Sequence, residues 1–390
     1  MTEQARNAGP LIYLVACEPS ADQLGAQLMA ALTAETKGRV RFSGIGGPRM
    51  ERAGLRSLFD PRELALLGIF EVLPAFRRVL ARVAETVTHI RSTAPAVLVT
   101  IDSWGFTGRI HQRLSQSGST IPRIRYVAPQ VWAWRPGRAR QLARWIHHLM
   151  ALLPFEPPYF TRYGLPTTWV GHPVVESGAR RGDGHAFCER YKIAQDAMVL
   201  TVLPGSRRGE VRRLLPVFAE TVARLARERG PFAVLIPTVP GVADMVQEAV
   251  KAWPVAATIV DAEEIYDAFA VSTAALAASG TVSLELAMAG VPHLVAYRVN
   301  PLSALTFRML RRTRYVNLVN VLLGRMAVPE MLQESCRADR LAQAMLPLLE
   351  DPQTRARQRA DFHEAAEKLS PEGQSPSRLA AHIVLRAINP

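Results

Sequence analysis

Residues 11–32, LIYLVACEPSADQLGAQLMAAL, decide the fold class of this chain. The first six residues form a continuous apolar run, which is typical of a β-strand that is buried on both faces of a sheet. Pro19 suits the first turn of a helix. The apolar residues after it fall on one helical face: Leu24, Leu28 and Ala31. The stretch therefore predicts a buried strand followed by an amphipathic helix, which is the repeating unit of α/β proteins.

The same strand-and-helix unit recurs along the chain in two series. The first series continues with VRFSGIG, AVLVTID, IPRIRYVAP and HLMALLPF and ends before a polar stretch, residues 177–185. A second series follows with AMVLTVLP, FAVLIP, AATIV, TAALAAS and PHLVAYR. Strands that alternate with helices indicate parallel, doubly wound sheets. The sequence therefore predicts an α/β fold with two Rossmann-like domains, residues 1–174 and 175–390, and the second domain ends in a helical tail.

The charge balance points to an anionic partner. The 390 residues include 47 lysines and arginines, nearly all of them arginine, against 34 acidic residues, so the formal net charge is +13. Arginine prefers phosphates and other planar partners that accept two hydrogen bonds. A balance of this size indicates a phosphorylated ligand, a nucleic acid or an acidic membrane surface.

The spacing of the cysteines and the hydropathy of the chain narrow the possible class of protein further. Cys17, Cys188 and Cys336 are scattered without a CxxC pair, which excludes a disulfide framework and leads us to expect no metal site. The first ten residues are polar, and no run approaches the roughly 18 apolar residues that span a bilayer. We therefore expect a cytoplasmic protein that is soluble or lies on a membrane from the cytoplasmic side.

Ligands of open parallel sheets bind beyond the carboxyl ends of the strands, so the residues after each predicted strand are the first candidates. In VLPGSRRGEV, residues 202–211, a strand runs into a tight turn at Gly205 and Ser206 and then into a helix. Amide N–H groups at such a helix start bind diphosphates, and Arg207 adds positive charge. The alternative is an ordinary turn with Ser206 as a helix cap and solvated arginines.

A second strand, turn and helix occur in ASGTVSLELAMAGVP, residues 278–292. The turn consists of the small residues Ser279, Gly280 and Thr281. Glu285 lies about one turn into the helix, on the side that is able to meet a ribose diol. The alternative interpretation of Glu285 is a first-turn glutamate that complements the helix dipole.

Carboxylates also follow strands in the first half of the chain. Asp102 comes directly after the AVLVTI strand, where a carboxylate is placed to take the proton from an attacking hydroxyl group. The alternative is a helix cap, for which Asp102 and Ser103 are both suited. Glu18, Ser20 and Asp22 after the first strand have the same two interpretations. The glycine loop SGIGGPRM lacks the full dinucleotide fingerprint, so we expect no nicotinamide site.

Two further segments have the composition of lipid or nucleic-acid contacts. Residues 127–145, VAPQVWAWRPGRARQLARW, interleave tryptophan with arginine, as single-stranded nucleic-acid and lipid head-group sites do. The alternative is core tryptophans beside a solvated basic helix face. Residues 64–83, LALLGIFEVLPAFRRVLARV, form either a buried helix or an apolar surface for acyl chains or membrane. The side chains concerned are Ile69, Phe70, Leu73 and Phe76.

Taken together, these segments resemble the lipid-A-disaccharide synthase family along nearly the whole chain. The segments that carry the resemblance include CEPSADQLGA, ELALLGIFEVLP, VAPQVWAWRP, LLPFEPPYF, LPGSRRGEV, ASGTVSLELAMAG and YVNLVNVLLGR, in this order and spacing. The resemblance implies a glycosyltransferase-B fold, in which two Rossmann-like domains face a cleft. It also implies inverting transfer of 2,3-diacylglucosamine from its UDP derivative to the 6-hydroxyl of 2,3-diacylglucosamine 1-phosphate, peripherally on the cytoplasmic face of the inner membrane of Gram-negative bacteria.

The resemblance also suggests roles for individual residues. By matching position, Asp102 is the general base, Arg207 meets the donor phosphates, and Glu285 holds the ribose. Asn320, which closes YVNLVN, matches an asparagine of the donor-side segment. The first domain then serves the acceptor and the membrane, and the second binds the UDP-sugar donor. The expected partners are the two sugar lipids and the membrane surface, with no cofactor, no metal and no nucleic acid.

The chain departs from the family pattern in two places near the expected acceptor site. CEPSAD follows the first predicted strand where the family usually has GEASGD, and Gly105 stands where a second aspartate is usual. Two other functions compete with this interpretation. One is a related glycosyltransferase that acts on the lipid-linked peptidoglycan precursor, and the other is a basic nucleic-acid-binding protein.

Overall fold

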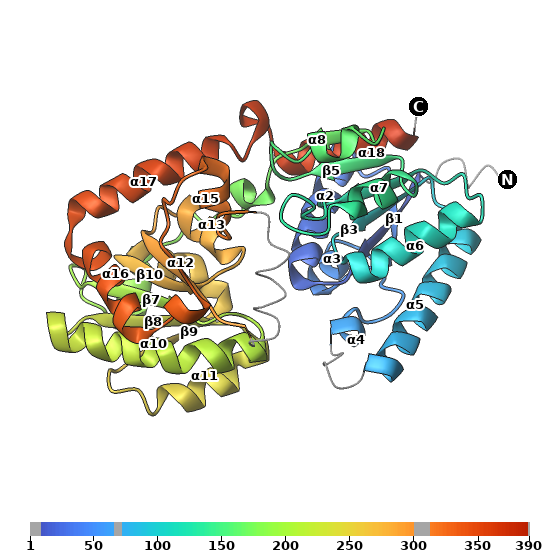
Figure 1. The fold of residues 1–390 in the computed structure, drawn as a ribbon. Helices are drawn as coiled ribbons and strands as arrows, with labels where there is room; N and C mark the ends of the chain where they lie inside the picture. Colours follow the sequence, from blue (N-terminus) through green and yellow to red (C-terminus); the bar gives the residue numbers. More distant parts are fainter. Residues whose placement is uncertain (1–8, 66–71, 300–312, 389–390) are drawn as a thin grey trace. The chain divides into compact units, whose positions relative to one another are not determined.

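The computed structural model describes residues 9–65, 72–299 and 313–388, and the chain forms two compact units (Figure 1). The first unit comprises Met1–Pro173 together with Leu369–Pro390, and the second comprises Val174–Lys368. Each unit contains one six-stranded sheet in which every neighbouring pair of strands is parallel, with helices packed against it. The predicted α/β fold with two Rossmann-like domains is confirmed.

The sheet of the first unit has the strand order β2-β1-β3-β4-β5-β6. After β2 the chain crosses back past β1 to form β3, so the direction in which strands are added reverses between β1 and β3. Ligands of such sheets bind at this switch point, beyond the carboxyl ends of the two strands. The strands are β1 Leu11–Ala16, β2 Arg41–Ile45, β3 Val97–Ile101, β4 Arg123–Tyr126, β5 His148–Ala151 and β6 Thr167–Trp169.

Alternation along β1 supplies apolar side chains to both faces of this sheet. Ile12 and Leu14 are fully buried in one core cluster, and Tyr13 and Val15 are fully buried in another. This burial on both faces is what the continuous apolar run predicted. The helices of the unit are α2 Pro19–Glu35, α3 Pro48–Arg52, α4 Arg62–Ala65, α5 Val72–Thr93, α6 Trp104–Gln116, α7 Gly137–Ala143, α8 Pro158–Thr161 and α18 Pro376–Ile388, with a 3-10 turn at Pro371–Gly373.

The last helix packs in the first unit, whereas the sequence placed residues 175–390 together in the second domain. Figure 1 shows α18 beside α2. Ala380, Ala381 and Val384 are buried in the same core cluster as Leu28 of α2. The helical pattern of the tail did not indicate a partner, and the structure places its last helix, α18, against α2. Its apolar face is completed by a helix from the start of the chain, which local sequence patterns do not reveal.

The sheet of the second unit has the strand order β12-β11-β10-β7-β8-β9. The chain adds β8 and β9 on one side of β7 and then crosses back to add β10, so the switch point lies between β7 and β10. The strands are β7 Val199–Leu203, β8 Ala233–Thr238, β9 Thr258–Asp261, β10 Ala274–Ala278, β11 His293–Tyr297 and β12 Glu330–Leu332. The turns of LPGSRR and ASGT thus follow the two strands that flank this switch point.

The helices of the second unit cover both faces of its sheet, with the longest, α10, burying the apolar residues Leu214, Leu215 and Phe218. They are α9 Gly184–Tyr191, α10 Arg208–Arg229, α11 Ala243–Val250, α12 Ile265–Val271, α13 Val282–Met288, α15 Leu318–Leu323, α16 Ala338–Glu350 and α17 Pro352–Glu367. Short 3-10 turns occur at Pro173–Glu176, Pro240–Val242, Ala262–Glu264 and Gln333–Ser335.

Candidate functional site

Asp102 and Ser103 form a strained turn at the carboxyl end of β3. Their φ angles are 51° and 48°, in the left-handed region that residues other than glycine rarely adopt. The Thr107 hydroxyl donates to the carbonyl oxygens of Asp102 at 2.7 Å and of Ser103 at 3.0 Å, which holds the turn closed. Ser103 is the N-cap residue of α6, but its side chain makes no capping hydrogen bond. The Asp102 side chain is 46% exposed, so its carboxylate is accessible.

The buried guanidinium of Arg125 links this turn to the next strand. Arg125 lies on β4, is fully buried, and donates from Nε to the Val127 carbonyl oxygen at 3.0 Å. Its Nη1 donates to the Thr107 hydroxyl at 2.8 Å, and its Nη2 lies 3.8 Å from Oδ1 of Asp102. Val127 also has a positive φ, 75°, which is unfavourable for a β-branched residue. One side chain therefore connects two strained turns at neighbouring strand ends.

Arg125 carries a charge in a place where charges are rare. Burial lowers the pKa of Arg125 to about 10, and the nearby Asp102 carboxylate opposes this shift. The guanidinium therefore stays protonated at neutral pH. No role was predicted for Arg125, although a charged residue within a predicted buried strand was a signal of this site.

Of the three candidate residues after β1, Glu18 contacts the Asp102 turn, whereas Ser20 and Asp22 lie elsewhere. Oε1 of Glu18 accepts a hydrogen bond from the Ser103 hydroxyl at 3.4 Å. Asp22 is buried and accepts from the amides of Gly47 and Met50 through Oδ1, and from the amide of Arg49 through Oδ2. The Asp22 carboxylate therefore fixes the glycine loop against α2, which is a structural role. Ser20 is exposed on the first turn of α2.

The pKa of the buried Cys17 thiol is affected by both Glu18 and Asp102. Burial raises the pKa of Cys17 to about 12, and the negative charges of Glu18 and Asp102 add to the shift. The carboxylates that follow β1 and β3 therefore act on the same point at the switch of the sheet, as expected for strands that are neighbours.

The apolar segment of residues 64–83 is only partly described. Ile69 and Phe70 lie outside the described residues. Leu73 and Phe76 lie on the first turns of α5, and their side chains are also outside the described part of the structure. Whether these four side chains are buried or exposed stays a prediction.

The tryptophans of residues 127–145 have different environments. Trp132 is buried, and its Nε1 donates to Oε1 of Glu156 at 3.1 Å. Trp134 is 36% exposed, and the guanidinium of Arg135 lies 4.7 Å from its ring centroid. Trp145 stacks on Trp104 with ring centroids 6.0 Å apart. The segment therefore combines core packing with an accessible aromatic and basic surface, and its role in binding lipid head groups or nucleic acid stays a prediction.

Glu156, within LLPFEPPYF, is a buried carboxyl group that holds this segment in place. Its Oε2 accepts from the amides of Leu152 and Leu153, both at 3.1 Å, while Oε1 accepts from Trp132. Burial raises the pKa of Glu156 to about 7, because these three hydrogen bonds only partly offset the loss of solvation.

On the second unit, the turn after β7 has the geometry that its glycine predicted. Gly205 has a φ of 110°, and a Cβ there would lie 2.6 Å from Oε2 of Glu210. Ser206 follows in the turn, and Arg207 is the N-cap residue of α10 with a 74% exposed side chain. Nη1 of Arg207 lies 3.9 Å from Oε1 of Glu210, which keeps the guanidinium near the helix start.

The turn after β10 is held by hydrogen bonds to neighbouring elements. The Ser279 amide donates to the Ala296 carbonyl at 3.0 Å, and Gly280 and Thr281 lead into α13. Oε1 of Glu285 accepts from the Tyr266 hydroxyl at 3.1 Å. Gly280 has space around it, since a Cβ there would meet no atom within 4 Å.

Asn320 differs from the sequence prediction, which assigned it to donor binding. The side chain is fully buried on α15, and its oxygen accepts from the amides of Ala327 and Val328, both at 2.8 Å. Its nitrogen donates to the Val328 carbonyl at 2.7 Å and to Glu330 at 2.8 Å. These four contacts use the full hydrogen-bonding capacity of the amide. The structure therefore gives the Asn320 amide a role in folding the YVNLVN segment, and its assignment to donor binding stays a prediction.

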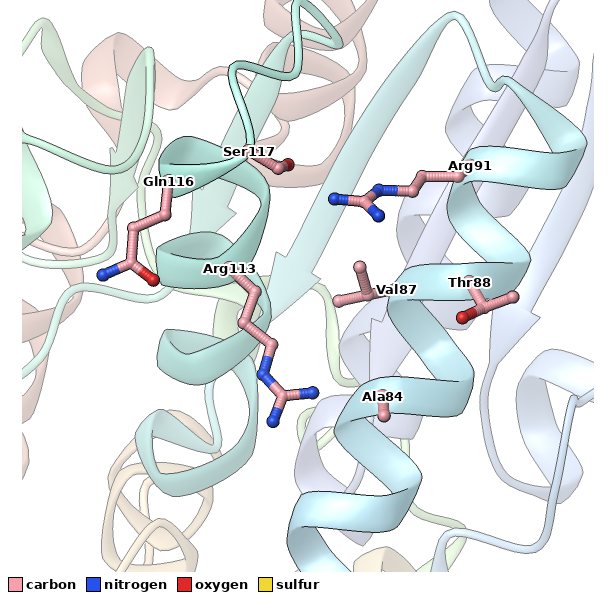
Figure 2. A pocket seen from close by; sticks show the side chains of 7 residues that line it. All are labelled: Ala84, Val87, Thr88, Arg91, Arg113, Gln116 and Ser117. Carbon is pink, nitrogen blue, oxygen red and sulfur yellow. The ribbon is translucent and has the colours of Figure 1, made fainter.

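Figure 2 shows a pocket that lies away from these strand ends, between α5 and α6. Arg91 and Arg113 line it near the C-terminal ends of the two helices. Those helix ends lie at the edge of the sheet opposite to Asp102, because both helices run antiparallel to the strands they adjoin. Arginines there complement the negative ends of the helix dipoles, which accounts for their position.

No group of three or more histidine, cysteine, aspartate or glutamate side chains in residues 9–65, 72–299 and 313–388 is arranged to hold a metal ion. Within the same part of the chain, none of the helices has the length and apolar character needed to cross a bilayer.

Comparison with protein families gives a match over nearly the full length. The sequence model of the family described as lipid-A-disaccharide synthetase matches residues 12–384. A lipid-A-disaccharide synthase of Rhodospirillum centenum is 54% identical over 379 residues, which cover 97% of this chain and 94% of the relative. That of Gluconobacter oxydans is 43% identical over 382 residues, covering 98% of this chain and 91% of the relative.

Solved structures with a similar fold share little sequence with this chain. The UDP-GlcNAc 2-epimerase of Neisseria meningitidis, bound to UDP-GlcNAc, has a TM-score of 0.62 at 12% identity, covering 97% of this chain and 99% of that chain. A glycosyltransferase of Rickettsia africae has a TM-score of 0.59 at 11% identity, covering 98% and 99%. At such low identity the likeness concerns the fold alone, and it agrees with two Rossmann-like domains of the glycosyltransferase-B type.

The raised pKa of Glu156 predicts a pH-dependent stability. Because the folded state holds the proton up to about pH 7 and the unfolded state releases it near 4.5, unfolding releases protons in between. The contribution of Glu156 to the free energy of unfolding is fully present below pH 4.5. It falls as the pH rises to 7, by about 3 kcal/mol, because the proton that the folded state holds is bound less tightly by the unfolded state. The Glu156→Gln variant lacks this pH dependence of stability. Its free energy of unfolding is lowered by the same amount at every pH, because an N–H group of the new amide faces the Trp132 N–H.

The measurement is the difference in free energy of unfolding between Glu156→Gln and the wild type, from denaturant titrations between pH 4.5 and 7.5. Other titrating groups, such as buried His172 and His293, cancel in this difference. A difference that stays constant across this range would contradict the assignment.

Proposed function

The chain belongs to the lipid-A-disaccharide synthase family and is a UDP-sugar glycosyltransferase of lipid A biosynthesis; within that family, we propose its substrates and the residues that act on them. It transfers 2,3-diacylglucosamine from the UDP derivative to the 6-hydroxyl of 2,3-diacylglucosamine 1-phosphate. The bond between the donor anomeric carbon and the diphosphate oxygen breaks, and a bond from that carbon to the acceptor oxygen forms with inversion. UDP leaves, and the hydroxyl proton passes to a base. The peptidoglycan-precursor and nucleic-acid alternatives are not favoured.

The observation that carries the acceptor side of this proposal is the position of Asp102. Its carboxylate is accessible, follows β3 at the switch point, and is held on a turn with two successive left-handed residues. Backbone strain of this kind costs about 1–3 kcal/mol per residue and is found preferentially at functional sites. A sugar hydroxyl is a weak nucleophile at neutral pH, so a positioned base is needed. Asp102 takes the proton as the hydroxyl oxygen attacks.

Arg125 acts on this reaction as a positioning residue. It donates to Thr107, which closes the Asp102 turn, and its Nη2 lies 3.8 Å from the Asp102 carboxylate. The fixed positive charge of Arg125 attracts the Asp102 carboxylate and so helps to set its position at the end of β3. Glu18 lies at the same edge through its contact with Ser103 and is the next candidate base.

The donor diphosphate binds in the second unit at the start of α10. Gly205 and Ser206 give the backbone amides of the turn access to a ligand, and the exposed guanidinium of Arg207 supplies a positive charge at the helix start. The ribose and sugar contact the turn after β10, Ser279, Gly280 and Thr281, with Glu285 behind it. Charge on the departing UDP is then stabilised by arginine and helix amides, without a metal.

The acyl chains and the net charge of +13 suggest where the enzyme works. Both substrates are lipids, and an arginine-rich protein is attracted to anionic bilayers. We place it peripherally on the cytoplasmic face of the inner membrane of a Gram-negative bacterium, with Ile69, Phe70, Leu73 and Phe76 as the apolar contact.

Asp102→Asn tests the base directly. The substitution keeps the shape of the side chain and removes its basicity, so turnover of UDP-diacylglucosamine with diacylglucosamine 1-phosphate in detergent falls at least a hundredfold. UDP affinity and melting temperature stay close to those of the wild type. Ser20→Ala, an exposed change at the other strand end, is the matched control and keeps turnover. Turnover of Asp102→Asn near the wild-type rate would transfer the role to Glu18.

Arg207→Ala tests the donor site. It removes a charge-assisted contact worth about 1.5–3 kcal/mol, so UDP binds roughly ten- to a hundredfold more weakly. Calorimetry in the presence of EDTA measures this affinity and also asks whether UDP binds without a metal. Arg212→Ala, an exposed arginine further along α10, is the control for loss of charge. Equal UDP affinity in the two variants would return Arg207 to a solvated surface role.

A further inference from the structure

Four side chains form a tryptophan–arginine cluster beside the Asp102 turn: Trp104, Trp134, Arg135 and Arg138. The guanidinium carbon of Arg138 lies 5.1 Å from the ring centroid of Trp104 and 5.0 Å from that of Trp134. The guanidinium of Arg135 lies 4.7 Å from the same Trp134 ring. Two cations therefore share one partly exposed aromatic ring. Stacking fixes the planes of both guanidinium groups while the N–H groups at their edges remain available.

The positive charge of this cluster is not neutralised within the described part of the chain. Neither Arg135 nor Arg138 forms an ion pair with a described carboxylate, whereas Arg125 has Asp102 at 3.8 Å. Burial lowers the pKa of Arg138, and the neighbouring charge of Arg135 lowers it further. Like charges held this close repel each other, so the arrangement favours the binding of an anion between them.

The cluster is continuous with the proposed catalytic edge. Trp104 comes two residues after Asp102, and the guanidinium carbon of Arg125 lies 5.5 Å from the Trp104 ring centroid. Nη2 of Arg125 is buried and has no hydrogen-bond partner among the described residues. The Trp104 ring therefore contacts two cations, the buried Arg125 and Arg138, and lies beside the proposed base Asp102. All these residues belong to the first unit.

The backbone also holds Arg135 in place. Its φ of 51° is in the left-handed region, and its carbonyl oxygen accepts from the Arg138 amide at 3.1 Å. The preceding loop is anchored through Trp132 and Glu156. A non-glycine residue kept in a strained conformation by its surroundings is characteristic of ligand-binding turns.

We infer that the tryptophan–arginine cluster binds the phosphate monoester of the acceptor sugar. This inference rests on the proposed function, because that acceptor carries both the attacking hydroxyl and a phosphate on one sugar ring. A phosphate monoester offers three oxygens and up to two negative charges to two arginine forks. Anchoring the phosphate at Arg135 and Arg138 orients the sugar so that its hydroxyl faces Asp102. Two-point binding of this kind raises the rate by proximity and selects phosphorylated acceptors.

The test compares two acceptors, diacylglucosamine 1-phosphate and its dephosphorylated form, in wild-type enzyme and in the double variant Arg135→Gln, Arg138→Gln. For the phosphorylated acceptor, the double variant lowers kcat/KM by about ten- to a hundredfold. For the dephosphorylated acceptor and for the UDP-sugar donor, the kinetic constants stay at their wild-type values. Arg140→Gln, an exposed arginine on α7, removes a charge nearby and leaves the preference unchanged.

A binding measurement keeps this result separate from the proposed reaction. Quenching of tryptophan fluorescence is followed as each acceptor is added without donor, and melting temperatures confirm that the variants are folded. Phosphate-dependent binding that the double variant loses supports the inference even if no disaccharide forms, in which case the proposed function fails alone. Equal preference for the phosphorylated acceptor in the wild type and the double variant overturns the inference.

The phosphate head groups of bilayer lipids are the other ligands with the chemistry that this cluster would bind. Sedimentation with vesicles of phosphatidylcholine and phosphatidylglycerol distinguishes them. If the double variant loses vesicle binding but keeps the wild-type acceptor preference, the cluster serves the membrane and the inference is wrong. Vesicle binding at the wild-type level, together with lost acceptor preference, supports it.

Discussion

The buried guanidinium of Arg125 is the interaction on which the turns at the ends of β3 and β4 depend. A charge without water costs several kcal/mol unless it is hydrogen-bonded and paired. Arg125 meets this demand with the Val127 carbonyl, the Thr107 hydroxyl and the Asp102 carboxylate. The same contacts hold two left-handed turns at the ends of neighbouring strands. The cost of burying the cation and the strain of the turns are therefore offset together, and the result is a carboxylate with a fixed orientation.

The second unit arranges its strand ends by a different physical route. There a glycine turn and the first residues of α10 present backbone amides, and two exposed arginines, Arg207 and Arg208, supply positive charge at the helix start. Buried polar contacts fix the neighbouring helix α13: the Ser283 hydroxyl contacts His293 Nε2 at 2.7 Å and accepts from the Asn317 amide. Burial lowers the pKa of His293 to about 4, so it is neutral at physiological pH. In the proposed reaction, the first unit thus positions the base and the second offers hydrogen-bond donors suited to a diphosphate.

Sequence patterns predicted those parts of the structure that depend on local periodicity. The apolar run of β1, the alternation of strands with helices, and the turns at Gly205 and Asp102 followed from spacing and residue type. Three features did not, because each depends on contacts between different elements, which periodicity within one helix or strand does not show. The burial of α18 requires α2, the saturation of the Asn320 amide requires Val328 and Glu330, and the role of Asp22 requires the amides of the glycine loop.

Arg125 is the clearest case of a site residue that the sequence did not assign. An arginine within a predicted buried strand does not reveal what its side chain contacts until the neighbouring strands are known. The register of β3 with β4 pairs Thr100 with Arg125, which brings the guanidinium to the turn after Ile101. Gly105, where the family usually has an aspartate, lies in open space, since a Cβ there would meet no atom within 4 Å. Packing therefore does not explain the missing carboxylate, and the proposed acceptor site rests on Asp102 with Arg125 in this chain.

A double-mutant cycle on kcat tests the dependence of Asp102 on Arg125 most directly. Arg125→Lys keeps a positive charge but loses the fork that reaches both Val127 and Thr107. In the wild-type background we expect it to lower kcat at least tenfold, with the melting temperature recorded as a control for folding. Once Asp102 is Asn, the same change should have little further effect, because the group that Arg125 positions is already inactive. An equal loss in both backgrounds would show that Arg125 acts independently of Asp102 and would contradict this account.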